Sequence, residues 1–291
     1  MIKILIKMLR RVVILIFVMF VMCVAWALCA MAAMAAEKAL TIDGDHGKLA
    51  AILQVPDGAD GKDNFPIVII CHGFTSKKEF KLLKDLADDL EACGIASLRF
   101  DFNGHGASEG SFQAMTVLNE LSDVKKVYEY VKLNIKQANQ IALAGHSQGG
   151  IVASMAAGDL GDDIKALALF APAAVLRDDA IRGNLFDAKF NSLNPPEFVA
   201  IMGGNFKVGR DYILTAQTLP IYETARKYKN PACLIHGTGD VIVPYTYSLR
   251  YHEIYSRSEL NIIKGWMHSF EDHEAEAAKI AADFFKKVLL K

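Results

Sequence analysis

The feature that most constrains the fold is a regular alternation of short apolar runs with longer stretches that carry apolar residues at helical spacing. The runs have few polar positions, which is typical of strands buried on both faces of a parallel sheet. They are residues 66–71, 96–100, 140–144, 166–170, 232–236 and 260–263. The predicted helices between them cover residues 80–92, 118–133, 151–157, 245–255 and 274–290. This order predicts an α/β fold with a mostly parallel central sheet and helices on both faces.

Two segments depart from this rhythm. Residues 40–43 and 49–55 predict a short antiparallel pair at the start of the domain, joined by a turn with two glycines. From Pro172 to about Tyr228 the sequence predicts no strand, but short amphipathic pieces separated by Pro and Gly pairs. We interpret residues 173–228 as a cap inserted over the sheet, within a single domain of residues 37–291.

The first 36 residues have the pattern of a targeting segment. Residues 12–36 carry no charge and end in small residues, and the residues before them are basic: Lys3, Lys7, Arg10 and Arg11. Ala33-Met34-Ala35 fits a signal cleavage site, so we expect a mature start near Glu37 and a periplasmic or secreted protein. The apolar run is also long enough to span a bilayer, which leaves an uncleaved anchor as the alternative. Both interpretations place residues 37–291 outside the cytoplasm.

The charge balance of the domain argues against a nucleic-acid partner. The chain has 32 Lys and Arg against 33 Asp and Glu. Because four of the basic residues and none of the acidic ones lie in residues 1–36, residues 37–291 carry 28 basic against 33 acidic residues. An acidic body of this kind does not suit binding to a phosphate backbone.

The strongest motif follows the predicted strand at residues 140–144. Gly145-His146-Ser147-Gln148-Gly149 has the G-x-S-x-G pattern and is followed by a predicted helix. A turn this tight leaves no room for side chains two positions before and after the serine. It would present the Ser147 hydroxyl at a helix N-terminus, where the amide of Gln148 can face a developing anion. We therefore predict Ser147 as a nucleophile.

A serine nucleophile needs a base, and the base needs an orienting acid. In this topology the chain order is serine, acid, histidine. Asp240 follows the strand at residues 232–236, and His268 follows the last strand. We predict Asp240 and His268 as the other two members of a triad. The alternatives that stay open are His252 and His273 as bases and Asp101 as the acid.

The anion of an acyl-transfer intermediate needs a second amide donor. His72-Gly73-Phe74 ends the first core strand, and we assign this donor to the backbone N–H of Phe74. His72 we interpret as a structural brace. The acidic and histidine residues near His268 lack metal-ligand spacing, so we predict no metal and no organic cofactor.

Several of these segments together carry a family resemblance. They are residues 72–74, 101–106, 145–150, 231–240 and 265–268, and, in and beside the cap, residues 171–174, 179–184 and 211–222. With them, the chain resembles the α/β-hydrolase superfamily from about residue 39 to its end. More narrowly, it resembles the bacterial feruloyl (cinnamoyl) esterases that have a small inserted cap.

The resemblance implies the same triad and the same oxyanion donors, Phe74 and Gln148. It also implies that Asp179 and Tyr212 of the cap hydrogen-bond the phenolic hydroxyl of a hydroxycinnamoyl group. The chain departs from the pattern at Phe186, where some relatives have a polar residue that contacts the ligand. That change favours less polar acyl groups.

We therefore predict a serine hydrolase that cleaves carboxylic esters through an acyl-enzyme, with hydroxycinnamoyl or similar esters as substrates. The expected partner is a small-molecule or polysaccharide-linked ester. We expect contact with a membrane only if residues 12–36 stay as an uncleaved anchor. The first alternative keeps the triad in a general carboxylesterase or lipase, a peptidase or a thioesterase. The second is an inactive, anchored binding protein on the same fold.

Overall fold

An eight-stranded sheet forms the centre of the domain in the computed structural model, which describes residue 19, residues 37–56 and residues 64–290. Its strands are β1 (Lys38–Asp43), β2 (Lys48–Gln54), β3 (Phe65–Cys71), β4 (Ala96–Phe100), β5 (Ala138–His146), β6 (Ile164–Phe170), β11 (Ala232–Gly237) and β12 (Ser258–Ile263). They lie in the order β1-β2-β4-β3-β5-β6-β11-β12. The pairs β1–β2 and β2–β4 are antiparallel, and the other neighbours are parallel. The predicted mostly parallel α/β sheet is confirmed, as is the antiparallel pair at its start.

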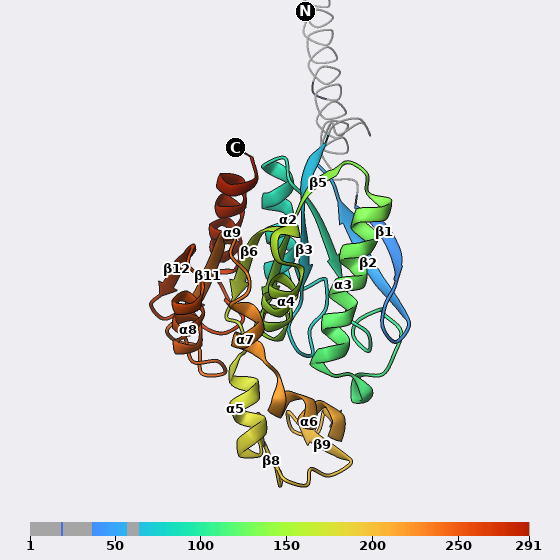
Figure 1. The fold of residues 1–291 in the computed structure, drawn as a ribbon, viewed down its shortest axis with the longest axis vertical. Helices are drawn as coiled ribbons and strands as arrows, with labels where there is room; N and C mark the ends of the chain where they lie inside the picture. Colours follow the sequence, from blue (N-terminus) through green and yellow to red (C-terminus); the bar gives the residue numbers. More distant parts are fainter. Residues whose placement is uncertain (1–18, 20–36, 57–63, 291) are drawn as a thin grey trace, which may run out of the picture. The chain divides into compact units, whose positions relative to one another are not determined.

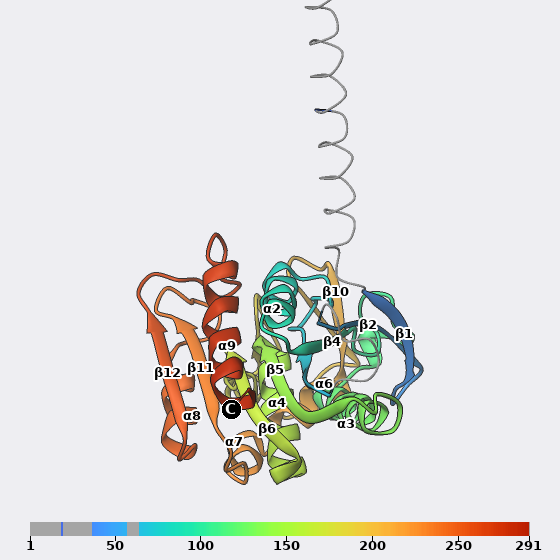
Figure 2. The ribbon, with the colours of Figure 1, turned by 90° about the horizontal axis from the view of Figure 1, so that it is seen from above.

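Helices cover both faces of this sheet, as predicted. They are α2 (Lys81–Ala92), α3 (Val117–Asn134), α4 (Ser147–Leu160), α8 (Thr246–Ile254) and α9 (Glu274–Leu289), with 3-10 turns at Phe112–Ala114 and Gly161–Asp163. Figure 2 shows α2 and α9 on one side of the strands and α3, α4 and α8 on the other.

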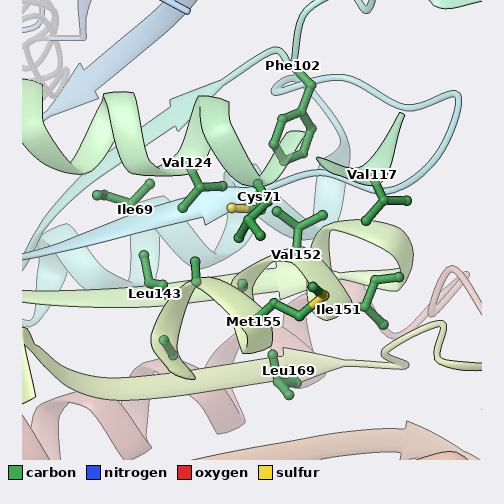
Figure 3. Close-up of a cluster of buried hydrophobic side chains, with 14 of the residues drawn as sticks. Ile69, Cys71, Phe102, Val117, Val124, Leu143, Ile151, Val152, Met155 and Leu169 are labelled. Atoms are coloured by element: carbon green, nitrogen blue, oxygen red, sulfur yellow. The ribbon is translucent and has the colours of Figure 1, made fainter. Parts of the chain in front are cut away.

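The two-sided cover explains why the strands are nearly continuous apolar runs. All seven residues of β3 are buried. Ile69 and Cys71 pack in the cluster with α3 and α4, whereas Val68 and Ile70 pack in the cluster with α2 and α9. Figure 3 shows part of the first cluster, where Ile69 and Cys71 lie between helices of that layer. Successive side chains of a strand point to opposite faces, so a strand covered on both sides has no face turned to water, and most of its residues are apolar.

The segment interpreted as a cap holds helices and two small hairpins. Its elements are α5 (Val175–Arg182), β7 (Asn184–Leu185), β8 (Ala188–Lys189), β9 (Phe198–Ile201), β10 (Phe206–Gly209), α6 (Arg210–Thr218) and α7 (Ile221–Ala225). In Figure 1, α5, α6, β8 and β9 gather at the lower end of the view, and α5 packs against α6.

The prediction that no strand lies between Pro172 and Tyr228 was wrong. The strands β7 and β8 pair with each other, and β9 pairs with β10. Each has two to four residues and none joins the central sheet. The turns that join strands this short determine where they form. The strands have too few residues for the alternation of apolar and polar positions to be recognised in the sequence.

The predicted targeting segment, residues 1–36, lies outside the described residues except for Met19. Both the cleaved signal and the uncleaved anchor therefore stay predictions. Among the described residues, no helix combines the length and the apolar character needed to cross a bilayer.

The turn between β5 and α4 is closely packed, backbone against backbone. A methyl group placed on Gly145 would lie 2.2 Å from the carbonyl oxygen of Gly149. One placed on Gly149 would lie 2.2 Å from the carbonyl oxygen of His72, in the loop after β3. The two glycines of the motif thus let β5, α4 and the β3 loop approach one another without side chains between them.

We predict that Gly149→Ala lowers the free energy of unfolding by about 3 kcal/mol or more, because overpacking against the backbone outweighs the gain of about 1 kcal/mol from alanine's helix propensity. Urea denaturation of the purified protein measures this. The matched control is Gly94→Ala directly after α2, where an added methyl group meets no atom within 4 Å but φ is 84°. That variant should lose only about 1–2 kcal/mol from backbone strain. A loss for Gly149→Ala no larger than for the control would contradict the steric account.

Candidate active site

Three predicted site residues meet at the carboxyl edge of the sheet. Ser147 begins α4 directly after β5, Asp240 lies in the loop after β11, and His268 follows β12. These strands are parallel, so their carboxyl ends lie at the same edge, where such sheets hold their sites. Residues far apart in the sequence are thereby brought together.

The three side chains form one line of hydrogen bonds. His268 Nε2 lies 2.9 Å from Ser147 Oγ, and His268 Nδ1 lies 2.7 Å from Asp240 Oδ2. Since a carboxylate only accepts, Nδ1 carries the ring proton and Nε2 is left to accept the proton of the serine hydroxyl. The exposed fractions of Ser147, Asp240 and His268 are 7%, 8% and 9%. The line is therefore largely shielded, and it can act chemically as a nucleophile with an oriented base.

Asp240 is held as a carboxylate by its neighbours. Its Oδ2 also lies 3.0 Å from His236 Nε2, and its Oδ1 accepts backbone N–H bonds from Ile242 at 2.9 Å and Val243 at 2.8 Å. Burial by itself raises the pKa of Asp240, but the hydrogen bonds from His236 and His268 outweigh it and hold that pKa well below its usual range. Asp240 therefore stays charged wherever His268 needs a partner.

Sequence reasoning gave His236 no role, although it lies in the same motif as Asp240. His236 is fully buried. Its Nε2 donates to Asp240 and to the carbonyl of Val243 at 2.9 Å, and its Nδ1 lies 2.7 Å from Ser248 Oγ. The only sequence signal is its spacing of four residues before the acid at the end of a buried strand.

The backbone around Ser147 is set for anion binding. Ser147 has φ of 54°, an uncommon value for a residue with a side chain. Gln148 is the second residue of α4, so its N–H has no acceptor within the helix and lies at the positive end of the helix dipole. A methyl group on Gly73 would lie 3.1 Å from Ser147 Cβ, which shows how closely the loop before Phe74 approaches this turn. Phe74, Ser147 and Gln148 line one cavity.

The structure does not bring the alternative acid and bases to this line of residues. Asp101 accepts from Lys78 N at 2.6 Å, from Lys78 Nζ at 2.7 Å and from Ala107 N at 2.9 Å, and so holds a loop together. His252 hydrogen-bonds Ser258, and the ring of His273 stacks on Trp266.

His72 also has a bracing contact on each ring nitrogen. Its Nε2 accepts from Phe102 N at 3.0 Å, so its Nδ1 carries the proton and donates to the carbonyl of Gly73 at 2.8 Å. Burial, with a contribution from His105, lowers the pKa of His72 to about 3, so the ring stays neutral. In the described ranges, no group of three or more His, Cys, Asp or Glu side chains is arranged to hold a metal ion.

A cavity of about 460 Å³ opens above Ser147. Its walls are mostly apolar and come from α5, the first hairpin of the cap and the loop after Asp240. The apolar lining includes Val175, Leu176, Leu185, Phe186, Val241 and Ile242, and the polar lining includes Asp179, Asn184, Lys189 and Tyr212. The volume suits a drug-sized acyl group with a few polar contacts.

Both predicted ligand-binding residues of the cap line this cavity. Asp179 on α5 has its nearest cation, Arg182, at 3.8 Å, and burial raises its pKa. Tyr212 on α6 donates its hydroxyl proton to Gln148 Oε1 at 2.6 Å. The Tyr212 oxygen therefore has only lone pairs left for a ligand in this arrangement.

A second residue without a predicted role is Glu120 of α3. Its exposed fraction is 2%, and its carboxyl oxygens lie 2.9 and 2.8 Å from Gln148 Nε2. Burial raises the pKa of Glu120 to about 8. The sequence held a signal for it, because Glu120 falls within the buried stripe Val117, Leu121 and Val124 of its helix.

Comparisons with known proteins agree with this fold. The serine aminopeptidase family S33 matches residues 62–195. Est1E from Butyrivibrio proteoclasticus, in a structure with ferulic acid bound, is 32% identical, with 87% of this chain and all of that chain covered and a TM-score of 0.82. A second Est1E structure gives 31% identity, 87% and 99% coverage and a TM-score of 0.79.

A protein of 31.7 kDa from the traX-finO intergenic region of Escherichia coli is 30% identical over 103 residues. That match spans 35% of this chain and 35% of the relative. The Est1E match, in contrast, extends over the whole of that protein at more than 30% identity. The chain therefore belongs to the α/β-hydrolase superfamily, as a serine hydrolase that resembles the feruloyl esterases.

Proposed function

We propose that the protein hydrolyses carboxylic esters through an acyl-enzyme on Ser147, and that its acyl group is hydroxycinnamoyl or similar. The observation that carries the proposal is the line from Ser147 through His268 to Asp240, with 2.9 and 2.7 Å between the hydrogen-bonding atoms. Nucleophile, base and orienting acid lie in this geometry in serine hydrolases.

The mechanism follows from the hydrogen bonds. His268 Nε2 takes the Ser147 proton as Oγ attacks the ester carbonyl, and the charge that develops on His268 is stabilised by Asp240. The backbone N–H groups of Phe74 and Gln148 stabilise the tetrahedral anion, and losing one such donor costs about 3 kcal/mol of transition-state stabilisation. His268 then protonates the leaving alcohol, and water repeats the sequence on the acyl-enzyme.

The cavity lining supports an aromatic acyl group with a phenolic hydroxyl. The ring of Phe186 stacks on that of Phe74, with centroids 5.5 Å apart and planes 19° apart, which makes a flat apolar wall. The carboxylate of Asp179 and the free lone pairs of Tyr212 both accept hydrogen bonds, so they match a donor on the ligand. The likeness to Est1E, which binds ferulic acid in its structure, supports the same assignment.

A peptidase is the second candidate, because the matched family is named for serine aminopeptidases. The same triad can attack an amide, and the fold does not choose between the two bonds. Assays on matched ester and amide substrates separate the two functions.

We also propose that residues 1–36 direct export. Expressed whole in a bacterial host, the protein should be recovered outside the cytoplasm with its N-terminus near Glu37, as read by intact mass and N-terminal sequencing. A product that keeps residues 1–36 and sediments with membranes would instead support the anchor. Recovery of the whole chain from the cytoplasm would contradict export in either form.

If the acyl group is hydroxycinnamoyl, the protein should hydrolyse methyl ferulate efficiently. The measurement is kcat/KM for this ester, compared with kcat/KM for p-nitrophenyl butyrate and for the amide analogue of the ferulate ester. Ser147→Ala should lose about 10⁴-fold or more in kcat on both esters. Tyr212→Phe should lose about tenfold on methyl ferulate and less on the butyrate, because only the first has a phenol to bind.

The matched control is Tyr222→Phe, which removes a cap hydroxyl that bonds the Tyr247 carbonyl at 3.0 Å instead. Turnover of the butyrate alone would keep the triad and discard the hydroxycinnamoyl group. Faster turnover of the amide than of the ester would favour the peptidase.

A further inference from the structure

The side chain of Gln148 joins α3 to the cap beneath the cavity. Its Nε2 lies 2.9 and 2.8 Å from the two carboxyl oxygens of Glu120, and its Oε1 accepts a 2.6 Å hydrogen bond from the Tyr212 hydroxyl. The exposed fractions of Glu120, Gln148 and Tyr212 are 2%, 3% and 2%. These three side chains form a bridge that is shielded from water. Each polar group in the bridge therefore needs another member of the bridge as its hydrogen-bond partner.

An amide side chain has one donor end and one acceptor end, and its orientation follows its neighbours. When Glu120 is ionised, it accepts from the Gln148 NH₂ group, and the Gln148 oxygen faces Tyr212, as in the structure. Tyr212 then gives its proton to Gln148 and offers lone pairs to the cavity. When Glu120 is protonated, its O–H needs an acceptor, and the Gln148 oxygen supplies one if the amide turns over. The NH₂ group then faces the Tyr212 oxygen, and the Tyr212 proton is free to point into the cavity.

We propose that Glu120 is a positioning residue that sets, through the Gln148 amide, whether Tyr212 accepts or donates a hydrogen bond toward the substrate. The inference rests on the proposed function, since it concerns the para substituent of a cinnamoyl group. A para-hydroxyl group is matched by an accepting Tyr212. A para-methoxy group, which has no proton, is matched by a donating Tyr212.

The surroundings of Glu120 allow it to change charge near neutral pH. Burial raises its pKa to about 8, the hydrogen bond from Gln148 opposes this, and the charge of Asp123 on the same helix adds to it. The other titratable groups around the bridge are Cys71 of β3 and Tyr212 itself, and burial raises the pKa of both, so they stay neutral. Burial raises the pKa of Asp123 to about 6, so it is charged over the upper part of this range. Glu120 is then mostly protonated below about pH 8 and ionised above it.

The test is the ratio of kcat/KM for methyl 4-hydroxycinnamate to that for methyl 4-methoxycinnamate, measured from about pH 6 to 8.5. Ionisation of His268 affects both esters alike and cancels in the ratio. We expect the ratio to rise about fivefold or more with pH, as Tyr212 changes from donor to acceptor. Glu120→Gln, which cannot titrate, and Tyr212→Phe should each lose this rise and keep only the change that ionisation of the substrate's own phenol causes near the upper end of the range.

The matched control is Asp123→Asn, which removes another buried carboxyl group of α3 that binds the backbone of Asn103 and Asp45 and does not contact Gln148. It should keep the rise of the ratio, although the midpoint moves to lower pH because a neighbouring negative charge is lost. A flat ratio in the unmodified protein, or a rise that persists in Glu120→Gln, would overturn the proposal.

A failure of the proposed function would look different from a failure of this switch. Hydrolysis of p-nitrophenyl butyrate without turnover of either cinnamate would discard the hydroxycinnamoyl group and, with it, this role of Tyr212. Turnover of both cinnamates at a constant ratio would overturn the switch alone. Should Glu120→Gln fold poorly, binding can be measured instead of turnover. Calorimetry would give the Kd of 4-hydroxycinnamic acid and of 4-methoxycinnamic acid for Ser147→Ala across the same pH range. The preference for the 4-hydroxy acid should then rise with pH.

Discussion

The strained turn at Ser147 is the constraint on which the rest of the site depends. A serine at φ of 54° costs of the order of 1–3 kcal/mol and persists only where its surroundings hold it. Here Gly145 and Gly149 let the backbones of β5, α4 and the β3 loop touch. The Ser147 carbonyl also accepts from Ala173 N at 3.0 Å, which ties the turn to the start of the cap. The hydroxyl is therefore oriented by packing before any substrate binds.

Two adjacent parallel strands position Asp240 and His268, the other two members of the hydrogen-bonded line. The strands β11 and β12 pair directly, so the loops that carry Asp240 and His268 leave the sheet side by side. Within β11 itself, His236 is locked between Ser248 and Asp240, so a rigid strand residue fixes the carboxylate. Buried charge is tolerated here because each oxygen of Asp240 has hydrogen-bond donors.

The sequence was enough to predict the sheet, its helices and the residues at its carboxyl edge, because strand burial and the serine turn leave strong local patterns. Other features of the site depend on contacts between residues that are far apart in the sequence, and these leave no local pattern. Glu120 and Gln148 are 28 positions apart and meet only through helix packing. Tyr212 reaches Gln148 because the cap folds back over the sheet. The hairpins β7–β8 and β9–β10 are too short for periodicity to show them. A buried polar residue in an apolar stripe, such as Glu120, marks that a partner exists but does not identify it.

Covalent trapping of the serine tests the central claim most directly. The protein would be treated with a fluorophosphonate, and the modified residue would be located by peptide mass spectrometry. The account predicts one phosphonyl group on Ser147, and labelling at least about a hundredfold slower in His268→Ala, because that side chain is the base that activates the hydroxyl. Ser154→Ala, which changes a buried serine of α4 that bonds the Ile151 carbonyl, should label as the unmodified protein does. Label on another residue, or none at all in the folded protein, would contradict the account.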